Sequence, residues 1–126
     1  MQPAFAAPDL LHHLEASQDV ERDALPFGVI GMALDGTVRQ YNTTEAALSG
    51  LTPARVIGRH FFTSVAPCTN NALVARRFEA EAPLDDIIDY VFTLRMAPTP
   101  VQLRLLKHPL AQCMYLLVQR RPASAG

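Results

Sequence analysis

The chain has 126 residues, of which 49% are hydrophobic and 18% charged, and its net charge is −1. This length predicts one domain with a real core, and the mixed charges argue against a broad basic surface for nucleic acid or anionic lipid. No apolar stretch approaches the roughly 18 residues of a membrane-spanning helix, and the first residues do not resemble a secretion signal. The two cysteines, Cys68 and Cys113, make no disulfide framework, so we expect a reducing, cytoplasmic setting without membrane contact.

The first predicted element is a short helix over residues 8–15. Asp9 is placed to accept hydrogen bonds from the unpaired N–H groups of its first turn. His12 and His13 are adjacent and point about 100° apart on a helix, with no third ligand near in sequence. We therefore interpret both as surface histidines rather than metal ligands.

A β-hairpin is predicted next, over residues 27–41. The pair Asp35-Gly36 stands between two extended segments, and such a pair is typical of a two-residue type I′ turn. Tyr41 lies near the end of the second strand.

Helical segments are expected to follow the hairpin. Either Asn42 or Thr43 can cap the first of them, and Gly50 suits the position just after its end. The predicted helices cover residues 42–50, 52–58 and 72–82.

In the last third of the chain the apolar residues no longer recur at helical spacing but at every second position. This alternation predicts three consecutive strands, over residues 86–94, 101–105 and 113–121. Cys113 begins the third strand and is expected to be structural. Residues 122–126 are expected to be a disordered tail.

Together these elements predict the α+β class, as a five-stranded antiparallel sheet flanked by short helices. This layout resembles a PAS sensor domain, which keeps a ligand cavity between its sheet and its helices. The expected organisation is an N-terminal helical cap over residues 1–26, a PAS core over 27–121 and the tail, all within a single domain.

Cys68 is the side chain with the most distinctive chemistry. It follows a proline, with an apolar stretch before it and the turn-forming residues 69–71 after it. A thiol in that position can face a cavity and still be reached by a reactant. The alternative is a small buried hydrophobic residue, which is the usual state of an unpaired cysteine.

A second set of candidates is spaced by four residues: Tyr41, Glu45 and Ser49. If this segment is helical, the three side chains share one side. A phenol and a protonated carboxyl there can both donate hydrogen bonds to one buried anion, because burial raises the pKa of a carboxyl group. The alternative is an exposed glutamate on an amphipathic turn.

Several motifs in this register resemble the photoactive yellow protein family. The resemblance covers residues 9–121, apart from a short deletion around Ala82-Pro83, and its most specific part is the run from Val65 to Thr69. The other matching residues are Asp35-Gly36, Gln40-Tyr41-Asn42, Glu45, Gly50, Val56-Ile57-Gly58, Phe61-Phe62, Tyr90, Phe92 and Met96-Ala97-Pro98-Thr99.

The resemblance implies a blue-light photoreceptor that holds p-coumaric acid as a thioester on Cys68. It further implies that Tyr41 and Glu45 donate hydrogen bonds to the phenolate, that Ser49 supports Tyr41, and that Glu45 gives up its proton after trans-cis isomerisation. Loss of that proton is expected to loosen the N-terminal cap. The remaining residues expected around the chromophore are Ile30, Leu51, Phe61, Val65, Pro67, Thr69, Tyr90, Phe92 and Met96.

Leu51 is a departure, because the family commonly has an arginine there. Leucine can shield the pocket but supplies neither charge nor hydrogen-bond donors. The photocycle rate and the pKa of the phenolate are therefore the properties that this replacement affects.

Two other functions stay open from the sequence. One is a light-independent relative whose free Cys68 binds or transfers an acyl thioester, with His60 as the nearby base. The other is a PAS scaffold that only mediates protein contacts. In the favoured interpretation the chain is a photosensory chromoprotein rather than an enzyme, a monomer or weak dimer, and it signals to an unknown downstream protein.

Overall fold

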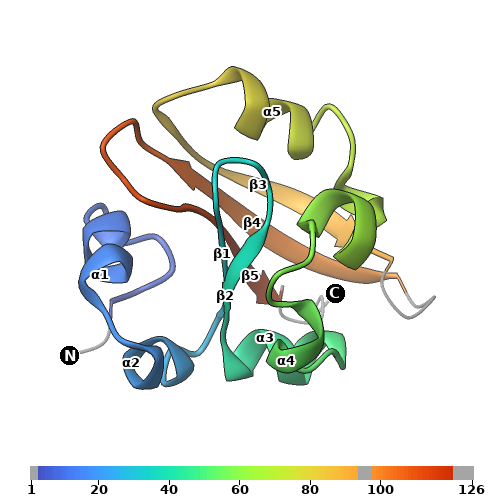
Figure 1. Cartoon of the computed structure of the whole chain (residues 1–126), viewed down its shortest axis with the longest axis horizontal. Helices are drawn as coiled ribbons and strands as arrows, with labels where there is room; N and C mark the ends of the chain where they lie inside the picture. Colours follow the sequence, from blue (N-terminus) through green and yellow to red (C-terminus); the bar gives the residue numbers. More distant parts are fainter. Residues whose placement is uncertain (1–2, 94–97, 121–126) are drawn as a thin grey trace, which may run out of the picture.

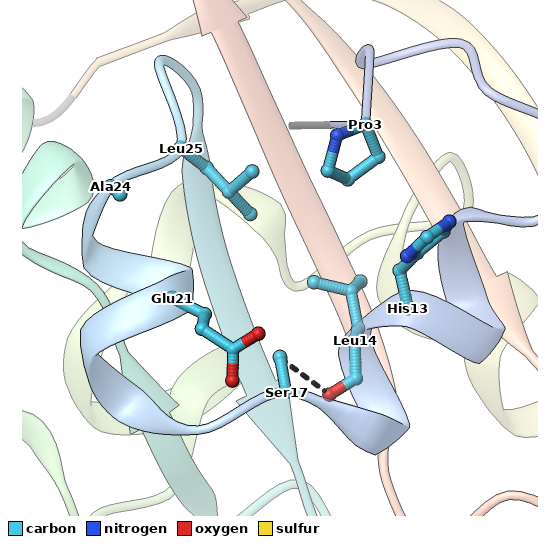
Figure 2. Close-up of a pocket in the computed structure, with 7 residues that line it drawn as sticks. All are labelled: Pro3, His13, Leu14, Ser17, Glu21, Ala24 and Leu25. Carbon is cyan, nitrogen blue, oxygen red and sulfur yellow. Dashed lines mark hydrogen bonds between the residues drawn. The ribbon is translucent and has the colours of Figure 1, made fainter. Parts of the chain in front are cut away.

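A computed structural model of the chain describes residues 3–93 and 98–120 (Figure 1). Its centre is a five-stranded antiparallel sheet with the strand order β2-β1-β5-β4-β3. The predicted sheet is confirmed. Its strands are β1 (Gly28–Met32), β2 (Val38–Tyr41), β3 (Leu84–Phe92), β4 (Thr99–Lys107) and β5 (Met114–Arg120).

Short helices occupy the rest of the described chain. A single π-helical turn (Phe61–Val65) and a 3-10 turn (Pro67–Thr69) separate the fourth helix from the fifth. Within the described part of the chain, no helix has the length and apolar character needed to cross a bilayer. The helices are α1 (Leu10–Ala16), α2 (Asp19–Asp23), α3 (Thr43–Ser49), α4 (Pro53–Val56) and α5 (Ala75–Ala80).

The sheet is covered on both faces. Successive residues of a strand point to opposite faces, and all residues from Met114 to Val118 of β5 are buried. Two separate clusters result. The site core contains Ile30, Tyr41, Phe61, Val65, Phe92, Leu103 and Leu116 among others, and the cap core consists of Phe5, Leu10, Leu14, Leu25, Phe27, Val29, Leu106, Tyr115 and Leu117.

The β1–β2 hairpin forms as predicted, but its turn is longer than a two-residue type I′ turn. Ala33 N–H donates to Thr37 O at 2.8 Å, and Gly36 N–H donates to Ala33 O at 2.9 Å. Gly36 has a φ of 93°, and Asp35 Oδ1 accepts from Thr37 N–H at 2.9 Å. The loop therefore uses Gly36 for its left-handed position, while Asp35 contributes a side-chain bond across the turn.

The predicted cap of the first helix is wrong. Among the described residues, Asp9 makes no side-chain capping bond to α1, and its carboxylate instead lies 3.1 Å from His13 Nε2. His13 and His12 are both exposed, as predicted for surface histidines. No group of three potential metal ligands occurs in the described ranges.

Several other predicted boundaries differ from the structure; for example, the strand expected over residues 101–105 extends over Thr99–Lys107. The helix expected over residues 72–82 begins only at Ala75, and the strand expected from residue 86 begins at Leu84. The expected N-terminal cap corresponds to α1 and α2, which precede β1. The predicted disordered tail lies outside the described residues.

Candidate functional site

Tyr41 ends β2, where it pairs with Ile30 of β1, and its side chain is buried. Its Oη lies 2.7 Å from Ser49 Oγ, at the end of α3. Ser49 Oγ also accepts a bond from Leu51 N–H at 3.1 Å. Burial, with the nearby charge of Glu45, raises the pKa of Tyr41 above its ordinary value. Tyr41 therefore keeps its proton and remains a hydrogen-bond donor at neutral pH.

Glu45 lies in the first turn of α3 and is only 2% exposed. Asn42 caps this helix, because its Oδ1 accepts from Glu45 N–H at 3.0 Å. Burial raises the pKa of Glu45 to about 8, and the charge of Arg120 opposes that rise only in part. The carboxyl group is therefore mainly protonated at neutral pH.

The carboxyl of Glu45 lacks a hydrogen-bond partner for Oε1 among the described residues. It also lies directly over β1, since a Cβ added to Gly28 would be 2.1 Å from Glu45 Oε1. A buried polar atom without a partner is costly and rare in native proteins, so it calls for a ligand or another partner. A protonated carboxyl in this position fits a ligand with a buried anionic oxygen.

Cys68 lies in the 3-10 turn and is half-buried against the site core. The turn is anchored by Thr69, which is fully buried and donates its Oγ1 hydroxyl to Ala66 O at 2.7 Å. Pro67, expected around the chromophore, has an exposed side chain. Its contribution is to hold the backbone at the first position of the turn.

The carbonyl oxygen of Cys68 is held by two donors. Tyr90 Oη, from β3, donates to it at 2.7 Å, and Asn71 Nδ2 donates to it at 3.1 Å. Tyr90 also packs edge-to-face on Phe92, with ring centroids 5.9 Å apart. Sequence reasoning treated Asn71 only as a turn-forming residue. The signal that was available is its position just before the apolar run that leads into α5.

The remaining expected residues take up different places. The apolar side chains Ile30, Phe61, Val65 and Phe92 are all buried in the site core. Leu51 and Tyr90 are half-buried against the same core. Met96 lies outside the described residues. The site core thus has a thiol packed against it and two protonated donors, Tyr41 and Glu45, buried within or beside it.

His60, the base considered for Cys68, lies beside the β1–β2 turn. Phe61 N–H donates to Gly36 O at 2.9 Å, so this segment runs beside the β1–β2 turn. The imidazole sits over the same turn, because a Cβ added to Gly36 would be 2.5 Å from His60 Nε2. The other ring nitrogen, Nδ1, lies 3.1 Å from Thr63 Oγ1. The contacts described for the two nitrogens are thus with the β1–β2 turn and with Thr63.

Cys113 lies on the opposite side of the sheet. It is a free thiol packed against the cap core, and burial with the nearby carboxylate of Glu15 raises its pKa. Its environment is that of a structural cysteine.

Known proteins resemble this chain over most of its length. No family model matches the chain. A photoactive yellow protein from Halochromatium salexigens is 34% identical over 119 residues, which is 92% of this chain and 95% of the relative. A photoactive yellow protein from Rhodothalassium salexigens is 32% identical with the same coverage.

Solved structures give the same result. The photoactive yellow protein domain of the sensor histidine kinase Ppr from Rhodospirillum centenum is 39% identical with a TM-score of 0.80, covering 87% of this chain and 99% of that chain. The PAS domain of an HTR-like protein from Haloarcula marismortui is 18% identical with a TM-score of 0.57, covering 90% of this chain and 96% of that chain, and it shares the fold alone. The chain therefore belongs to the photoactive yellow protein family, a family of photosensors on the PAS fold.

Proposed function

We propose that this chain is a blue-light photosensor that binds p-coumaric acid through a thioester on Cys68. The observation that carries the proposal is the carboxyl of Glu45, which is buried, protonated at neutral pH and without a partner for Oε1 among the described residues. A phenolate oxygen would accept hydrogen bonds from both Glu45 and Tyr41. Short bonds from two acidic donors keep such an oxygen ionised in a dry pocket.

Attachment requires an activated form of the acid, such as its coenzyme A ester. Cys68 Sγ, as the thiolate, attacks the acyl carbonyl carbon; the new carbon–sulfur bond forms and the bond to coenzyme A breaks. The released coenzyme A thiolate takes up the proton that Cys68 lost. When bound, the p-coumaroyl group supplies a double bond that light isomerises and a phenol oxygen that can be ionised.

The residues of this chain then have separate tasks. Tyr41 donates its hydroxyl and is oriented by Ser49 Oγ at 2.7 Å. Glu45 holds its proton at the carboxyl group and is the donor that can release it, because its pKa is near 8 while that of Tyr41 lies well above its ordinary value. The apolar side chains of the site core exclude water.

Release of the proton leaves a carboxylate at a position that is 2% exposed. Burying an unpaired charge is costly, so the packing of α3 on β1 becomes less stable. Asn42 connects this event to the N-terminal segment: it caps α3 at Glu45 N–H, and its Nδ2 donates to Arg22 O at 2.9 Å and Phe27 O at 3.0 Å. We propose that the N-terminal helices loosen as the signal.

Leu51 shields the site without supplying charge. The ionised phenol oxygen then depends on Tyr41 and Glu45 for its stabilisation, so it should gain a proton at a higher pH than it would beside a guanidinium. We further propose a cytoplasmic location, supported by the two free thiols, and a separate downstream signalling protein as the receiver.

The test is covalent loading. Apoprotein mixed with p-coumaric anhydride should gain one p-coumaroyl group by mass and a visible absorption band. Cys68→Ala should gain neither, and the matched variant Cys113→Ala should load like the unmodified chain. Loading of Cys68→Ala, or no loading of the unmodified chain, would contradict the proposal.

A further inference from the structure

The side-chain amide of Asn71 uses all of its hydrogen-bonding capacity. Its Nδ2 donates to the carbonyl oxygen of Cys68 at 3.1 Å and to Tyr90 Oη at 2.6 Å. Its Oδ1 accepts from the backbone N–H groups of Leu73 at 3.0 Å and Val74 at 3.1 Å. Two donated and two accepted bonds are the full capacity of a carboxamide.

These partners fix the orientation of the amide. The backbone N–H groups of Leu73 and Val74 can only donate, and the carbonyl of Cys68 can only accept. Exchanging the oxygen and nitrogen of Asn71 would therefore oppose donor to donor and acceptor to acceptor. The two ends of the amide have separate tasks: Oδ1 shapes the entry to α5, and Nδ2 holds Cys68.

The bond to Cys68 reinforces a short element. The 3-10 turn around Cys68 has three residues, and Asn70 N–H donates to Pro67 O across it at 3.0 Å. Such turns are weak by themselves. Two further donors, from Asn71 and from Tyr90 on β3, converge on the Cys68 carbonyl. They fix the peptide plane after Cys68 and hence the direction in which its side chain leaves the backbone.

We propose that Asn71 is a positioning residue that sets the direction of the Cys68 thiol and so controls the rate at which the thiol is acylated. This inference rests on the proposed function, because it concerns the thiol that takes the chromophore. Reaction rates depend steeply on the orientation of the attacking atom. A thiol directed along the site core meets an acyl group that enters that core, whereas a released thiol spends part of its time turned toward solvent.

The substitution Asn71→Asp separates the two tasks of this side chain. A carboxylate keeps the two acceptor bonds to Leu73 and Val74 but has no hydrogen to donate to Cys68 or Tyr90. The matched control is Asn70→Asp, which adds the same charge to the neighbouring residue, whose side chain is exposed. Both variants are made in a Cys113→Ala background, so that Cys68 is the thiol that reacts.

Two reagents report on the direction of the thiol. In the reaction with p-coumaric anhydride, Cys68 Sγ forms the carbon–sulfur bond, the anhydride carbon–oxygen bond breaks, p-coumarate leaves, and the thiol proton passes to the buffer. Iodoacetamide is small and alkylates any exposed thiol, with loss of iodide and a proton. We expect Asn71→Asp to be acylated about tenfold more slowly and alkylated several-fold faster, with Asn70→Asp within about twofold of the parent.

Opposite changes in the two rates support positioning, because general unfolding would expose the thiol to both reagents. Tyr90→Phe, which removes the other donor to the same carbonyl, should change both rates in the same opposite directions. If Asn71→Asp does not fold, Asn71→Ser keeps a short acceptor for the entry to α5 and should show the same split.

The outcomes also separate this inference from the proposed function. Equal alkylation rates in the Asn71 and Asn70 variants, or parallel changes with both reagents, overturn the positioning role. If the parent chain takes no p-coumaroyl group, the proposed function fails, and the alkylation ratio still decides whether Asn71 directs the thiol.

Discussion

The two faces of the sheet are held in different ways. On the site face the chain crosses from β2 to β3 through three helices and two short turns, and it buries Glu45 with an unpaired Oε1 among the described residues. On the cap face the covering segment is the N-terminal part of the chain, and buried Arg104 joins it to the sheet.

Arg104 binds both the sheet and the N-terminal segment. Its Nε and Nη2 donate to the two carboxylate oxygens of Asp85 at 2.9 and 3.0 Å. Its Nη1 donates to Phe5 O at 2.9 Å and Ala7 O at 2.7 Å. The comparison teaches that the buried carboxyl without a partner for Oε1 among the described residues lies on the site face, whereas the N-terminal segment on the cap face is held both by the apolar cap core and by polar bonds to Arg104.

The largest expected effect on the free energy of unfolding comes from replacing the buried carboxyl of Glu45 on the site face. The pKa of Glu45 in the folded chain, about 8, is above its ordinary value of 4.5, so the unfolded chain binds fewer protons between these pH values. Stability is then present at low pH and falls as the pH rises toward 8, by about 1.4 kcal/mol per pH unit and about 5 kcal/mol in total.

Glu45→Gln should lack this fall. The measurement is the free energy of unfolding of both apoproteins in urea at pH 5, 6, 7 and 8. Their difference isolates Glu45, because the other titrating groups are common to both chains. Parallel curves would show that Glu45 is not buried in its neutral form.

A smaller effect on the free energy of unfolding is expected from removing the hydrogen bonds of Arg104 on the cap face. Arg104→Met keeps an apolar side chain in the buried position and removes the bonds to Asp85, Phe5 O and Ala7 O. We expect a loss of about 2 kcal/mol in unfolding free energy and faster hydrogen exchange in α1.

The control for this variant is Arg76→Met, which removes the exposed pair between Arg76 and Glu79. That change should cost less than about 0.5 kcal/mol. Equal effects of the two arginine variants would mean that the cap is held mainly by apolar contacts.

The smallest effect tests whether the two faces can be perturbed separately. Tyr115 Oη donates to Glu15 Oε2 of α1 at 2.7 Å, and Tyr90 Oη donates to Cys68 O on the other face at 2.7 Å. Tyr115→Phe should cost about 1 kcal/mol and speed hydrogen exchange in α1 without altering the reactivity of Cys68. Tyr90→Phe should change the reactivity of Cys68 without speeding hydrogen exchange in α1. If both variants changed both measurements, the two faces of the sheet would respond as one unit.

Much of the fold follows from local patterns in the sequence. Period-two alternation located β3, β4 and β5, and the capping residue Asn42 and the left-handed Gly50 bound α3 as expected. These features depend on residues close in the chain. The type of the hairpin turn was wrong because an Asp-Gly pair also fits a three-residue loop with glycine in the left-handed position.

The tertiary features were not predictable in the same way. The burial of Arg104 depends on Phe5 and Ala7, nearly a hundred residues earlier in the chain. The α-helix begins only at Ala75 because the turn before it is wider than an α-helical turn: Arg76 N–H donates to Asn71 O, five residues earlier, at 3.0 Å. For the site, Tyr41 and Ser49 meet at 2.7 Å although Tyr41 lies in β2 rather than on the helix that the spacing assumed. The two donors to the Cys68 carbonyl were not predictable from spacing, because one of them, Tyr90, lies 22 residues away.

Gly28 has a consequence for engineering this protein. The backbone of β1 at this position sets the clearance between the sheet and α3, because the Glu45 carboxyl occupies the volume of the missing methyl group. Gly28→Ala would act as a spacer that lifts the acid away from the strand without changing any titratable group. Residue 28 is therefore a geometric control on the position of the Glu45 carboxyl, one that can be adjusted separately from the protein's charges.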